Sequence, residues 1–474
     1  MPPDLLHALA SNVWTWFLIA LFFGGSIFVH ELGHFLAARW RGVHVERFSI
    51  GFGPKILSWR RDGVEYRLSW LPLGGYVLLP QLADLGPMEG TVASEVAKLP
   101  PIRYSSKVIV FLAGAAFNIL FAFALACVIW IVGQPTNSDE ATTRIGYITQ
   151  TVDLPDGTKA PSPALLAGLQ VGDSILAVDG RKVSDWSDLV QLLITSSGRG
   201  PDGQPQSVFT IERDGHTSDV TLHPRLSGDE RLRRVGIAPA YELIIHAIQP
   251  DSPAQKAGLR PGDQILSLDS TPVRNAGTWQ DYLQAHDGQA VAVKVLRDQA
   301  ELALTLPPRP GAKDASDLGL EFATGFHLTH PNPFTQVADN VGMTFRTLWS
   351  LLNPHSDIGF SKLTGPVGIV HIFHDAASAA GLPAVIMFTI LINVSLAIFN
   401  LLPLPILDGG QIVFATISKL RGRALPVSII ATAQSVFMVL LLTMFVYVTF
   451  FDVRRWNRDA KEEKAAADAA HAKP

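Results

Sequence analysis

The chain has 474 residues, of which 48% are hydrophobic and 17% are charged. This balance favours a membrane protein with a soluble insert over a soluble enzyme, and the length corresponds to about three units of typical domain size. The formal net charge of −4 gives no support to nucleic-acid binding. The single cysteine, Cys127, excludes both a disulfide within one chain and a cysteine-ligated metal site.

The first predicted membrane span covers residues 13–38. Trp14 to Ala38 is almost wholly apolar, and about 20 apolar residues in a helix suffice to cross a bilayer. The residues before it contain no Lys or Arg, so the positive region of a signal peptide is missing, and the apolar run is too long for one. We therefore interpret the segment as a retained membrane span.

Two histidines and a glutamate interrupt this span as His30-Glu31-x-x-His34. Residues four apart lie on one face of a helix, so both imidazoles can bind a single metal ion. Glu31 is placed to take a proton from a water that the metal activates. Ionisable groups are costly inside a membrane, which favours this role over a structural pair of histidines bonded to nearby carbonyls. Such a site needs a third protein ligand.

The segment 39–105 is basic and is predicted to face the cytoplasm, which places the N-terminus outside. Its cations are Arg39, Arg41, Arg47, Lys55, Arg60, Arg61, Arg67, Lys98 and Arg103. Tyr66–Trp70 and Gly75–Leu79 are predicted strands, with Leu71–Gly74 turning between them. This hairpin, about 64–80, is apolar enough to enter the membrane as a re-entrant element. An ordinary loop at the membrane surface is the alternative.

The second predicted span covers residues 107–133. It contains Gly114-Ala-Ala-Phe-Asn118, in which small residues let helices approach closely and a buried amide needs a partner. Plain helix packing explains this pattern as well as a catalytic role does.

Residues 135–310 are β-rich and contain an internal repeat at an offset of 90 residues. Ala167-Gly-Leu-Gln-Val-Gly-Asp-Ser-Ile-Leu176 recurs as Ala257-Gly-Leu-Arg-Pro-Gly-Asp-Gln-Ile-Leu266. The pattern resembles two tandem PDZ domains, at 135–228 and 229–310, which bind peptides by adding a strand to a sheet edge. The candidate peptide-binding loops are Arg144–Tyr147 and Val235–Ile237. The alternative is that the pair acts as a spacer or size filter.

The region 311–380 contains one predicted amphipathic helix, Pro333–Leu352, which we expect to lie on the membrane surface. His371 and His374 are three residues apart. We interpret them as structural rather than as a second metal site, because no acidic or thiol partner has a suitable spacing.

The third predicted span, 382–404, runs into Asn400-Leu-Leu-Pro-Leu-Pro-Ile-Leu-Asp-Gly-Gly410, where two prolines break the helix. Asp408 is an acid in an otherwise apolar stretch, and it supplies the missing ligand: two imidazoles and one carboxylate leave a fourth position for water, as in catalytic zinc sites. The alternative role of Asp408 is as N-cap of a helix over 409–420.

The fourth predicted span is 426–451, followed by a charged tail, 453–474, predicted as a frayed or solvated helix. Four spans place both termini outside. The cations Arg454, Arg455 and Arg458 of the tail conflict with that topology, although nearby acids soften the conflict.

Taken together, these residues resemble the site-2 protease family of intramembrane zinc metalloproteases, of the kind that carries tandem PDZ domains. The resemblance covers nearly the whole chain. It depends on the motif from His30 to His34, Phe48–Pro54, Pro72–Val77, Thr364–Gly368 and Asn400–Gly410, besides the repeat. It implies a multi-pass α-helical membrane protein of about four transmembrane helices, with a re-entrant β-hairpin and two inserted PDZ (β-rich α+β) domains.

By position, the resemblance implies that His30, His34 and Asp408 bind one catalytic zinc ion and that Glu31 is the catalytic base. It implies a hairpin that holds the substrate extended, and a role for the asparagines in positioning substrate. The substrate-positioning residues predicted in this way are Gly74, Gly75, Tyr76, Asn118 and Asn400.

The sequence departs from the family pattern at two positions. Ala115 replaces a common proline in the second span, and Ser395 stands where a second asparagine often lies. Substrate positioning is therefore expected to differ in detail, while the predicted metal ligands and base are intact.

The expected activity is intramembrane cleavage of single-span membrane proteins, such as anti-sigma factors or signal-peptide remnants, after a first cut by another protease. The expected location is a bacterial inner membrane, with the PDZ domains periplasmic and the active site near the cytoplasmic side. Partners are the bilayer, these substrates and a peptide or ectodomain at the PDZ domains. A non-catalytic PDZ scaffold is the main alternative. A zinc transporter would spread acids and histidines along several spans.

Overall fold

The computed structural model describes residues 3–82, 99–137, 139–228, 231–312, 314–324, 326–377 and 381–471. The chain divides into two compact units. One unit joins the N-terminal segment up to Gln134 with His330–Phe345 and the segment from Phe360 onward. The other contains Pro135–Thr329 and Arg346–Gly359. The second unit is therefore an insertion in the sequence of the first.

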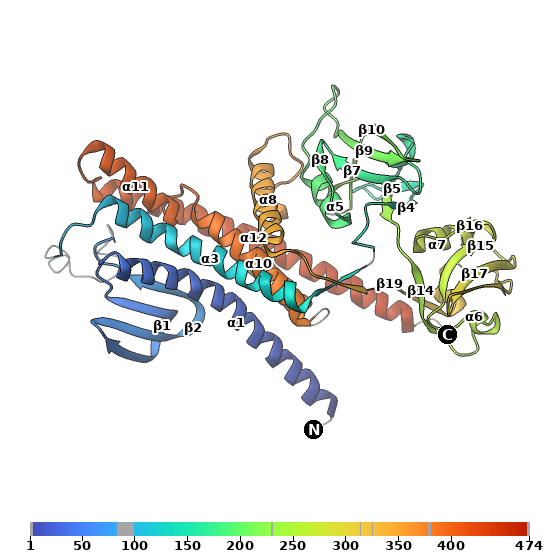
Figure 1. Cartoon of the computed structure of the whole chain (residues 1–474), viewed down its shortest axis with the longest axis horizontal. Helices are drawn as coiled ribbons and strands as arrows, with labels where there is room; N and C mark the ends of the chain where they lie inside the picture. The colour runs from blue at the N-terminus through green and yellow to red at the C-terminus, as the bar shows by residue number, and fades with distance from the viewer. Residues whose placement is uncertain are drawn as a thin grey trace. The chain divides into compact units, whose positions relative to one another are not determined.

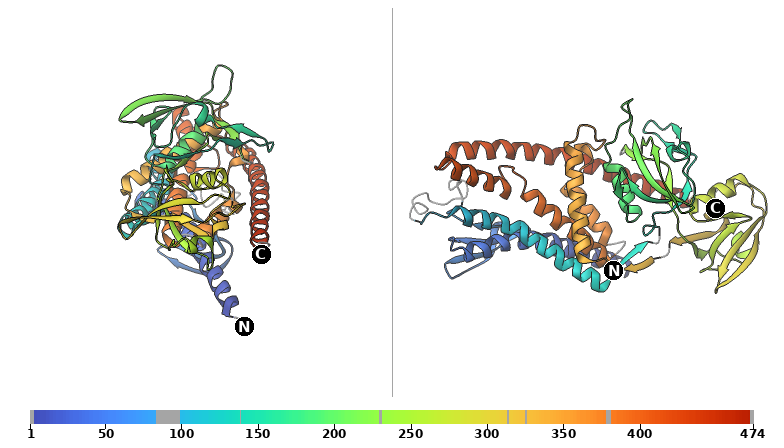
Figure 2. Two further views of the ribbon diagram at one scale, coloured as in Figure 1. Left: turned by 90° about the vertical axis from the view of Figure 1, so that its right-hand side faces the viewer. Right: turned by 45° about the horizontal axis from the view of Figure 1, so that its top comes forward.

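Within the described residues, four helices are long and apolar enough to cross a membrane. They are α1 (Pro3–Trp40), α3 (Tyr104–Val132), α10 (Gly381–Asn400) and α12 (Val427–His471). Their apolar stretches are Val13–Trp40, Tyr104–Val132, Gly381–Asn400 and Val427–Arg458. The four predicted spans are thus confirmed as helices of sufficient length, which fits a multi-pass membrane protein. The predicted tail continues α12 as the same helix, seen along its length in Figure 2.

Helix α3 packs against both α1 and α10 (Figure 1). Glycine at position 33 permits the close approach of α1, because a Cβ atom there would overlap the backbone oxygen of Ala113. A small residue of the first span therefore lets α1 approach the backbone of α3 closely.

The sheet beside these helices consists of β1 (Arg47–Arg61) and β2 (Val64–Leu78). The strands join at Asp62 and Gly63, whose φ angles of 52° and 80° belong to the left-handed region that Asp and Gly tolerate. Ile50 pairs with both Leu68 and Gly75. The chain therefore reverses between these two residues.

This register corrects the predicted two-stranded hairpin. The two predicted segments do not pair with each other. Instead, Arg47–Ile50 lies between them, with Glu65–Leu68 on one side and residues 75–78 on the other. The prediction did not include this interposed strand, although the alternation of Phe48, Ile50 and Phe52 is a local strand signal. Residues 75–78 form an outer strand, whose far side has no strand partner in the described part of the chain.

The inserted unit contains the same elements twice. The first set is α4 (Pro163–Leu166), β7 (Ser174–Val178), α5 (Trp186–Thr195), β9 (Ser207–Arg213), β10 (His216–Leu222) and β13 (Ile237–Pro239). The second is α6 (Pro253–Lys256), β15 (Gln264–Leu268), α7 (Ala276–Ala285), β17 (Val291–Arg297), β18 (Ala300–Leu306) and β19 (Leu320–Thr324). The strand order is β10-β9-β7-β8 in one sheet and β18-β17-β15-β14-β19 in the other. Each set encloses its own apolar core.

Shorter elements complete this unit. They are β3 (Gln134–Asn137), β4 (Ile145–Ile148), β5 (Thr151–Asp153), β6 (Lys159–Pro161), β8 (Arg181–Lys182), β11 (Arg225–Ser227), β12 (Leu232–Arg234), β14 (Leu243–Ile248), β16 (Thr271–Pro272), η1 (Ser316–Leu318) and β20 (Phe326–Thr329). The two candidate peptide-binding loops contribute β4 and the start of β13, which pair with each other. Pairing occupies one edge of each strand.

The repeated Gly-Asp signature contains a buried ion pair in each copy. Asp173 binds Arg213 through both carboxylate oxygens, each at 2.7 Å. Asp263 binds Arg297 in the same way, at 2.6 and 2.7 Å. Both aspartate side chains are only 1% exposed. The signature residues are thus explained by the fold of each repeat.

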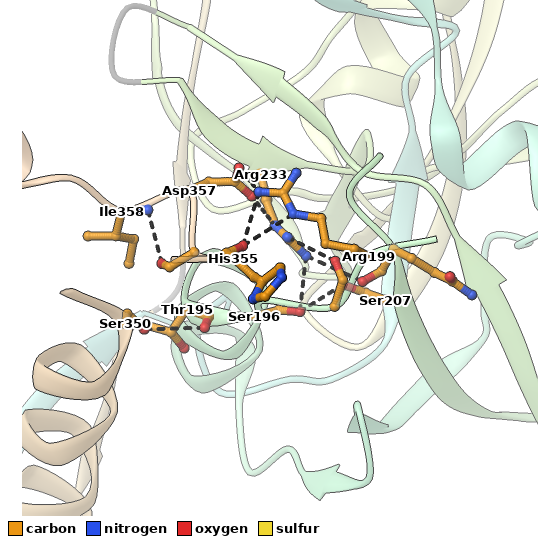
Figure 3. A network of polar contacts seen from close by, with 12 residues as sticks. Thr195, Ser196, Arg199, Ser207, Arg233, Ser350, His355, Asp357 and Ile358 are labelled. Carbon is orange, nitrogen blue, oxygen red and sulfur yellow. Dashed lines mark hydrogen bonds and ion pairs between the residues drawn. The ribbon is translucent and has the colours of Figure 1, made fainter. Parts of the chain in front are cut away.

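The segment after helix α8 (Pro333–Leu352) is bound to the first repeat by hydrogen bonds and ion pairs, as Figure 3 shows. Asp357 accepts hydrogen bonds from Arg199 at 2.6 Å and from Arg233 at 2.7 Å. The Arg233 side chain is fully buried. Helix α8 has the predicted bounds, and its position on a membrane surface stays a prediction.

The remaining elements are η2 (Phe360–Lys362), α9 (Pro366–Asp375) and α11 (Asp408–Arg421). His371 and His374 lie on α9. Within the described ranges, neither belongs to a group of three or more side chains that could hold a metal ion.

Candidate active site

One group of three His, Cys, Asp or Glu side chains in the described residues could bind a metal ion, and it consists of His30, His34 and Asp408. The two Nε2 atoms are 3.1 Å apart, and each lies 3.3 Å from Asp408 Oδ2. Ligand atoms about 2.0–2.1 Å from a tetrahedral zinc ion are separated by roughly 3.3 Å. The three donors therefore have the spacing and the chemistry that zinc requires.

Asp408 is positioned by the chain break that the prolines create. It is the first residue of α11, and the preceding Leu407 occupies the N-cap position. Its Oδ2 atom is buried and has no hydrogen-bond partner. The alternative interpretation as a helix N-cap is therefore wrong, and the carboxylate is left with a lone pair directed at the two imidazoles.

Polar contacts orient both imidazoles. His34 Nδ1 lies 2.7 Å from the backbone oxygen of Val110, which can only accept a hydrogen bond. This contact places the proton on Nδ1 and leaves Nε2 free to bind a metal. The Asn118 amide approaches His30 Nδ1 at 3.3 Å, and Asn400 Nδ2 lies 3.4 Å from His30 Nε2.

Asn118 is fully buried, and its Oδ1 atom has no hydrogen-bond partner. The amide contacts His30 Nδ1 through Nδ2. If the Asn118 side-chain amide is rotated by 180°, Oδ1 and Nδ2 exchange places. Oδ1 could then accept the proton on His30 Nδ1, which His30 carries when its Nε2 binds a metal. Its position favours a role in holding His30, whereas the sequence predicted substrate positioning.

Gly114 makes room for the two histidines. A Cβ atom at this position would lie 2.5 Å from His34 Nε2 and 2.7 Å from His30 Cε1. Glycine is therefore required where α3 passes behind the candidate ligands. From the sequence, helix packing and a catalytic role explain this glycine equally well.

Glu31 faces the outer strand of the sheet. A Cβ atom on Gly75 would lie 3.2 Å from Glu31 Cγ and 2.9 Å from the backbone oxygen of Ser49. The backbone of Val77 is hydrogen-bonded to the Glu31 carboxyl group. Gly75 therefore lets the strand edge approach the predicted base.

These groups open into a cavity of about 610 Å³. Among the predicted site residues, it is lined by His30, Glu31, His34, Tyr76, Asn400 and Asp408. Gly74 and Gly75 are buried in the adjoining strand, and Asn118 lies behind His30. The opposite wall contains Gln411 of α11, together with Gln434, Ser435, Met438 and Val439 of α12. Neither glutamine was predicted as a site residue from the sequence. Gln411 directly follows the Asn400–Gly410 motif, and Gln434 is a polar residue within the fourth span.

The model of peptidase family M50 matches residues 17–444 of this chain. That match covers most of the sequence and includes every candidate metal ligand. The chain belongs to peptidase family M50. The regulator of sigma E protease from Haemophilus influenzae is 30% identical over 450 residues, covering 90% of this chain and 96% of that protein.

Two further relatives of the M50 peptidase have similar coverage. The regulator of sigma-E protease RseP from Escherichia coli is 30% identical over 473 residues, covering 93% and 98% of the two chains. A putative zinc metalloprotease from Treponema pallidum is 28% identical over 447 residues, covering 91% and 96%.

Family membership agrees with the site. The protein is a zinc metalloprotease whose substrates are membrane proteins. With its four apolar helices, it is a multi-pass protein of the inner membrane. The expected family, enzyme class and zinc cofactor are thereby confirmed, and the non-catalytic scaffold does not fit them.

Proposed function

We propose that this M50 peptidase cleaves peptide bonds within transmembrane segments of single-span membrane proteins. One observation carries the proposal: the three zinc-type ligands, the Glu31 carboxyl group and an open strand edge meet in one cavity, and the histidines lie within an apolar span. Hydrolysis inside a membrane requires all of these in one place.

His30, His34 and Asp408 would hold the zinc ion. When bound, zinc polarises the scissile carbonyl and makes water easier to deprotonate. Glu31 takes the proton from the attacking water and delivers it to the leaving amine. Val110 keeps the His34 ring in the tautomer that has a free Nε2.

The substrate must unwind before it can be cut, because a helix hides its carbonyls in hydrogen bonds. Residues 75–78 form an outer strand beside Glu31, and its far side has no strand partner in the described part of the chain. Pairing the unwound segment to this edge replaces the lost hydrogen bonds, as in other strand-addition complexes. The hairpin would then act as a membrane-re-entrant element that presents the substrate to the site.

The basic segment 39–105 would face the cytoplasm and place the site near that side, with the inserted unit in the periplasm. Arg455 pairs with Asp452 at 2.7 Å, which removes one uncompensated charge from the tail. This pairing supports the proposed topology with both termini outside.

The two repeats would act as tandem PDZ domains near the path of substrate entry. We propose that they exclude substrates with bulky outer domains until another protease trims them. The relatives named for sigma E regulation favour anti-sigma factors as the trimmed substrates, and signal-peptide remnants fit the same geometry. A variant without the inserted unit that still spares an untrimmed substrate would contradict the size filter.

The proposed activity is tested by cleavage of a tagged single-span substrate in membranes, comparing wild type with Glu31→Gln. The substitution keeps the side-chain shape and removes the base. We expect cleavage by wild type alone, with equal zinc content in both proteins. Equal cleavage by both would overturn the proposal and favour a scaffold that recruits another protease.

A further inference from the structure

The cavity has two walls of different character. On one side lie Tyr76 and Val77 of the outer strand. On the other lies one face of α12, formed by Gln434, Ser435, Met438 and Val439. The α12 segment is otherwise strongly apolar and has many exposed large hydrophobic side chains, as expected for a helix in lipid. A long amide side chain at position 434 is therefore out of place unless it has a partner.

Gln434 is buried, with a relative exposure of 7%. Its Nε2 atom donates to the backbone oxygen of Pro405 at 3.3 Å. A carbonyl can only accept a hydrogen bond, so this contact fixes which end of the amide faces the proline loop. The Oε1 atom must then point away from Pro405, and it has no hydrogen-bond partner among the described residues.

A buried amide oxygen without a donor costs free energy, and the cost is larger in an apolar span. Gln434 lines the cavity and its Oε1 atom is covered, so a rotation of the side chain about its outer bonds would bring the oxygen within reach of a donor that enters the cavity. Every extended peptide carries such donors along both edges. When one edge is paired to residues 75–78, the backbone N–H groups of the other edge face away from that strand.

We propose that Gln434 is a substrate-binding residue whose side-chain oxygen accepts a hydrogen bond from a backbone N–H on the second edge of the unwound substrate. This inference rests on the proposed function, because it needs a substrate held extended in the cavity. Recognition of a backbone group works for any sequence that can be unwound. Gln434 would therefore increase the rate for all substrates rather than select among them.

The test uses the purified full chain with zinc and a synthetic single-span peptide that it cleaves. In a series of peptides, each backbone amide near the cut is replaced in turn by an ester, which removes one N–H donor. We expect esters that remove an N–H paired to residues 75–78 to lower kcat/KM equally in wild type and in the Gln434 variant. One ester on the other edge should lower kcat/KM for wild type by about 3- to 10-fold, the value of one hydrogen bond. Gln434→Met should lose a similar factor with the all-amide peptide and show no further loss with that ester.

One further variant and one stability measurement make the result specific. Gln411 is the other donor to the Pro405 oxygen, at 3.3 Å, so Gln411→Met reports any effect that acts through the proline loop. It should keep the full ester effect. Gln434→Met should also unfold at the same temperature as wild type or higher, because it removes an unpaired buried oxygen.

The outcomes separate the two hypotheses. If Glu31→Gln is inactive and the ester effects are the same in wild type and in Gln434→Met at every position, the role of Gln434 is overturned and the proposed function stands. If Glu31→Gln cleaves as fast as wild type, the proposed function fails and the inference fails with it.

Discussion

The carboxylate of Asp452, near the end of the fourth apolar stretch, accepts hydrogen bonds from the backbone N–H of Gly365 at 3.0 and 3.3 Å. It also accepts one from Gly368 at 2.9 Å. These amides open helix α9, whose first N–H groups have no partner within the helix. The acid thereby joins α12 to α9, and α9 packs in turn against α1.

Substituting Asp452 should release the start of α9. Asp452→Ala leaves the buried amides of Gly365 and Gly368 without an acceptor, at a cost of about 1–3 kcal/mol for each unpaired group. Hydrogen–deuterium exchange of residues 365–370 should become faster, while exchange in α3 stays unchanged. Glu301→Gln, a change of an exposed acid, should have no such effect. Unaltered exchange in the Asp452 variant would contradict the role of this carboxylate.

Gly114→Ala should abolish zinc binding while leaving the helix intact. Alanine is a better helix former than glycine, but its Cβ would lie 2.5 Å from His34 Nε2. Gly25→Ala is the matched control, since a Cβ at that position meets no atom within 4 Å. Metal analysis of both purified proteins checks the prediction. Equal zinc content in the two variants would show that His30 and His34 can move away from the alanine Cβ atom and still bind zinc.

The contact between Asn118 and His30 should tune zinc affinity. Removing a partner that orients a metal-binding histidine costs about 10- to 100-fold in affinity. We expect Asn118→Leu to weaken zinc binding by this factor, measured by competition with a chelator. Asn118→Asp keeps an acceptor and should retain more affinity than the leucine variant. Identical zinc affinities in wild type and both variants would show that Asn118 contributes to helix packing and does not orient His30.

The sheet should keep its fold to unusually low pH. Hydrogen bonds from Arg47 at 2.8 Å and Arg67 at 3.0 Å lower the pKa of Glu65 to about 2. A lowered carboxyl pKa stabilises the fold above the unfolded pKa of about 4.3, and this contribution is lost as the pH falls towards 2. The fluorine signal of 5-fluorotryptophan at Trp59, which stacks on Tyr66, reports the transition.

Glu65→Gln provides the control for this titration. The variant should be less stable than wild type at neutral pH, and its fluorine signal should be nearly independent of pH between about 2 and 5. A wild-type signal that changes around pH 4.3 would show that the arginines do not protect the carboxylate.

The buried ion pairs of the repeats should be needed for stability. Asp173→Asn leaves the Arg213 guanidinium without its charged partner. Because the Arg213 side chain is 33% exposed and water screens its charge, the cost should be below that of breaking a fully buried pair, about 3–5 kcal/mol. Limited proteolysis of the full chain should then cut within the first repeat, while the second repeat stays protected. Asp263→Asn should give the reverse pattern. Cleavage of both repeats in each variant would mean that they unfold together.

The sequence predicted the spans, and it singled out the three side chains that the fold brings together at the candidate metal site, because both depend on short-range patterns. Apolar length defines a span, and His30 and His34 share one helix face whatever the rest of the chain does. The motif around Asp408 is equally local, since two prolines and two glycines mark the break that exposes the carboxylate.

Features that depend on distant partners could not be predicted. The interposed strand Arg47–Ile50 pairs with residues on both sides. The alternation of Phe48, Ile50 and Phe52 indicates a strand here but not which segments it pairs with. The roles of Asp452 and Gln434 appear only when α12 is placed beside α9 and the proline loop. In the sequence, each is a polar residue near one end of the fourth apolar stretch, a position that does not identify its partners.

The candidate metal ligands come from distant parts of the chain: His30 and His34 lie in the first membrane helix, and Asp408 follows the third. A growing polypeptide that has not yet reached Asp408 therefore has no complete metal site. Proteolytic competence would arise only after nearly all of the protein has been synthesised and the third apolar helix has entered the bilayer. Nascent membrane proteins made nearby are then safe from an unfinished copy of this enzyme.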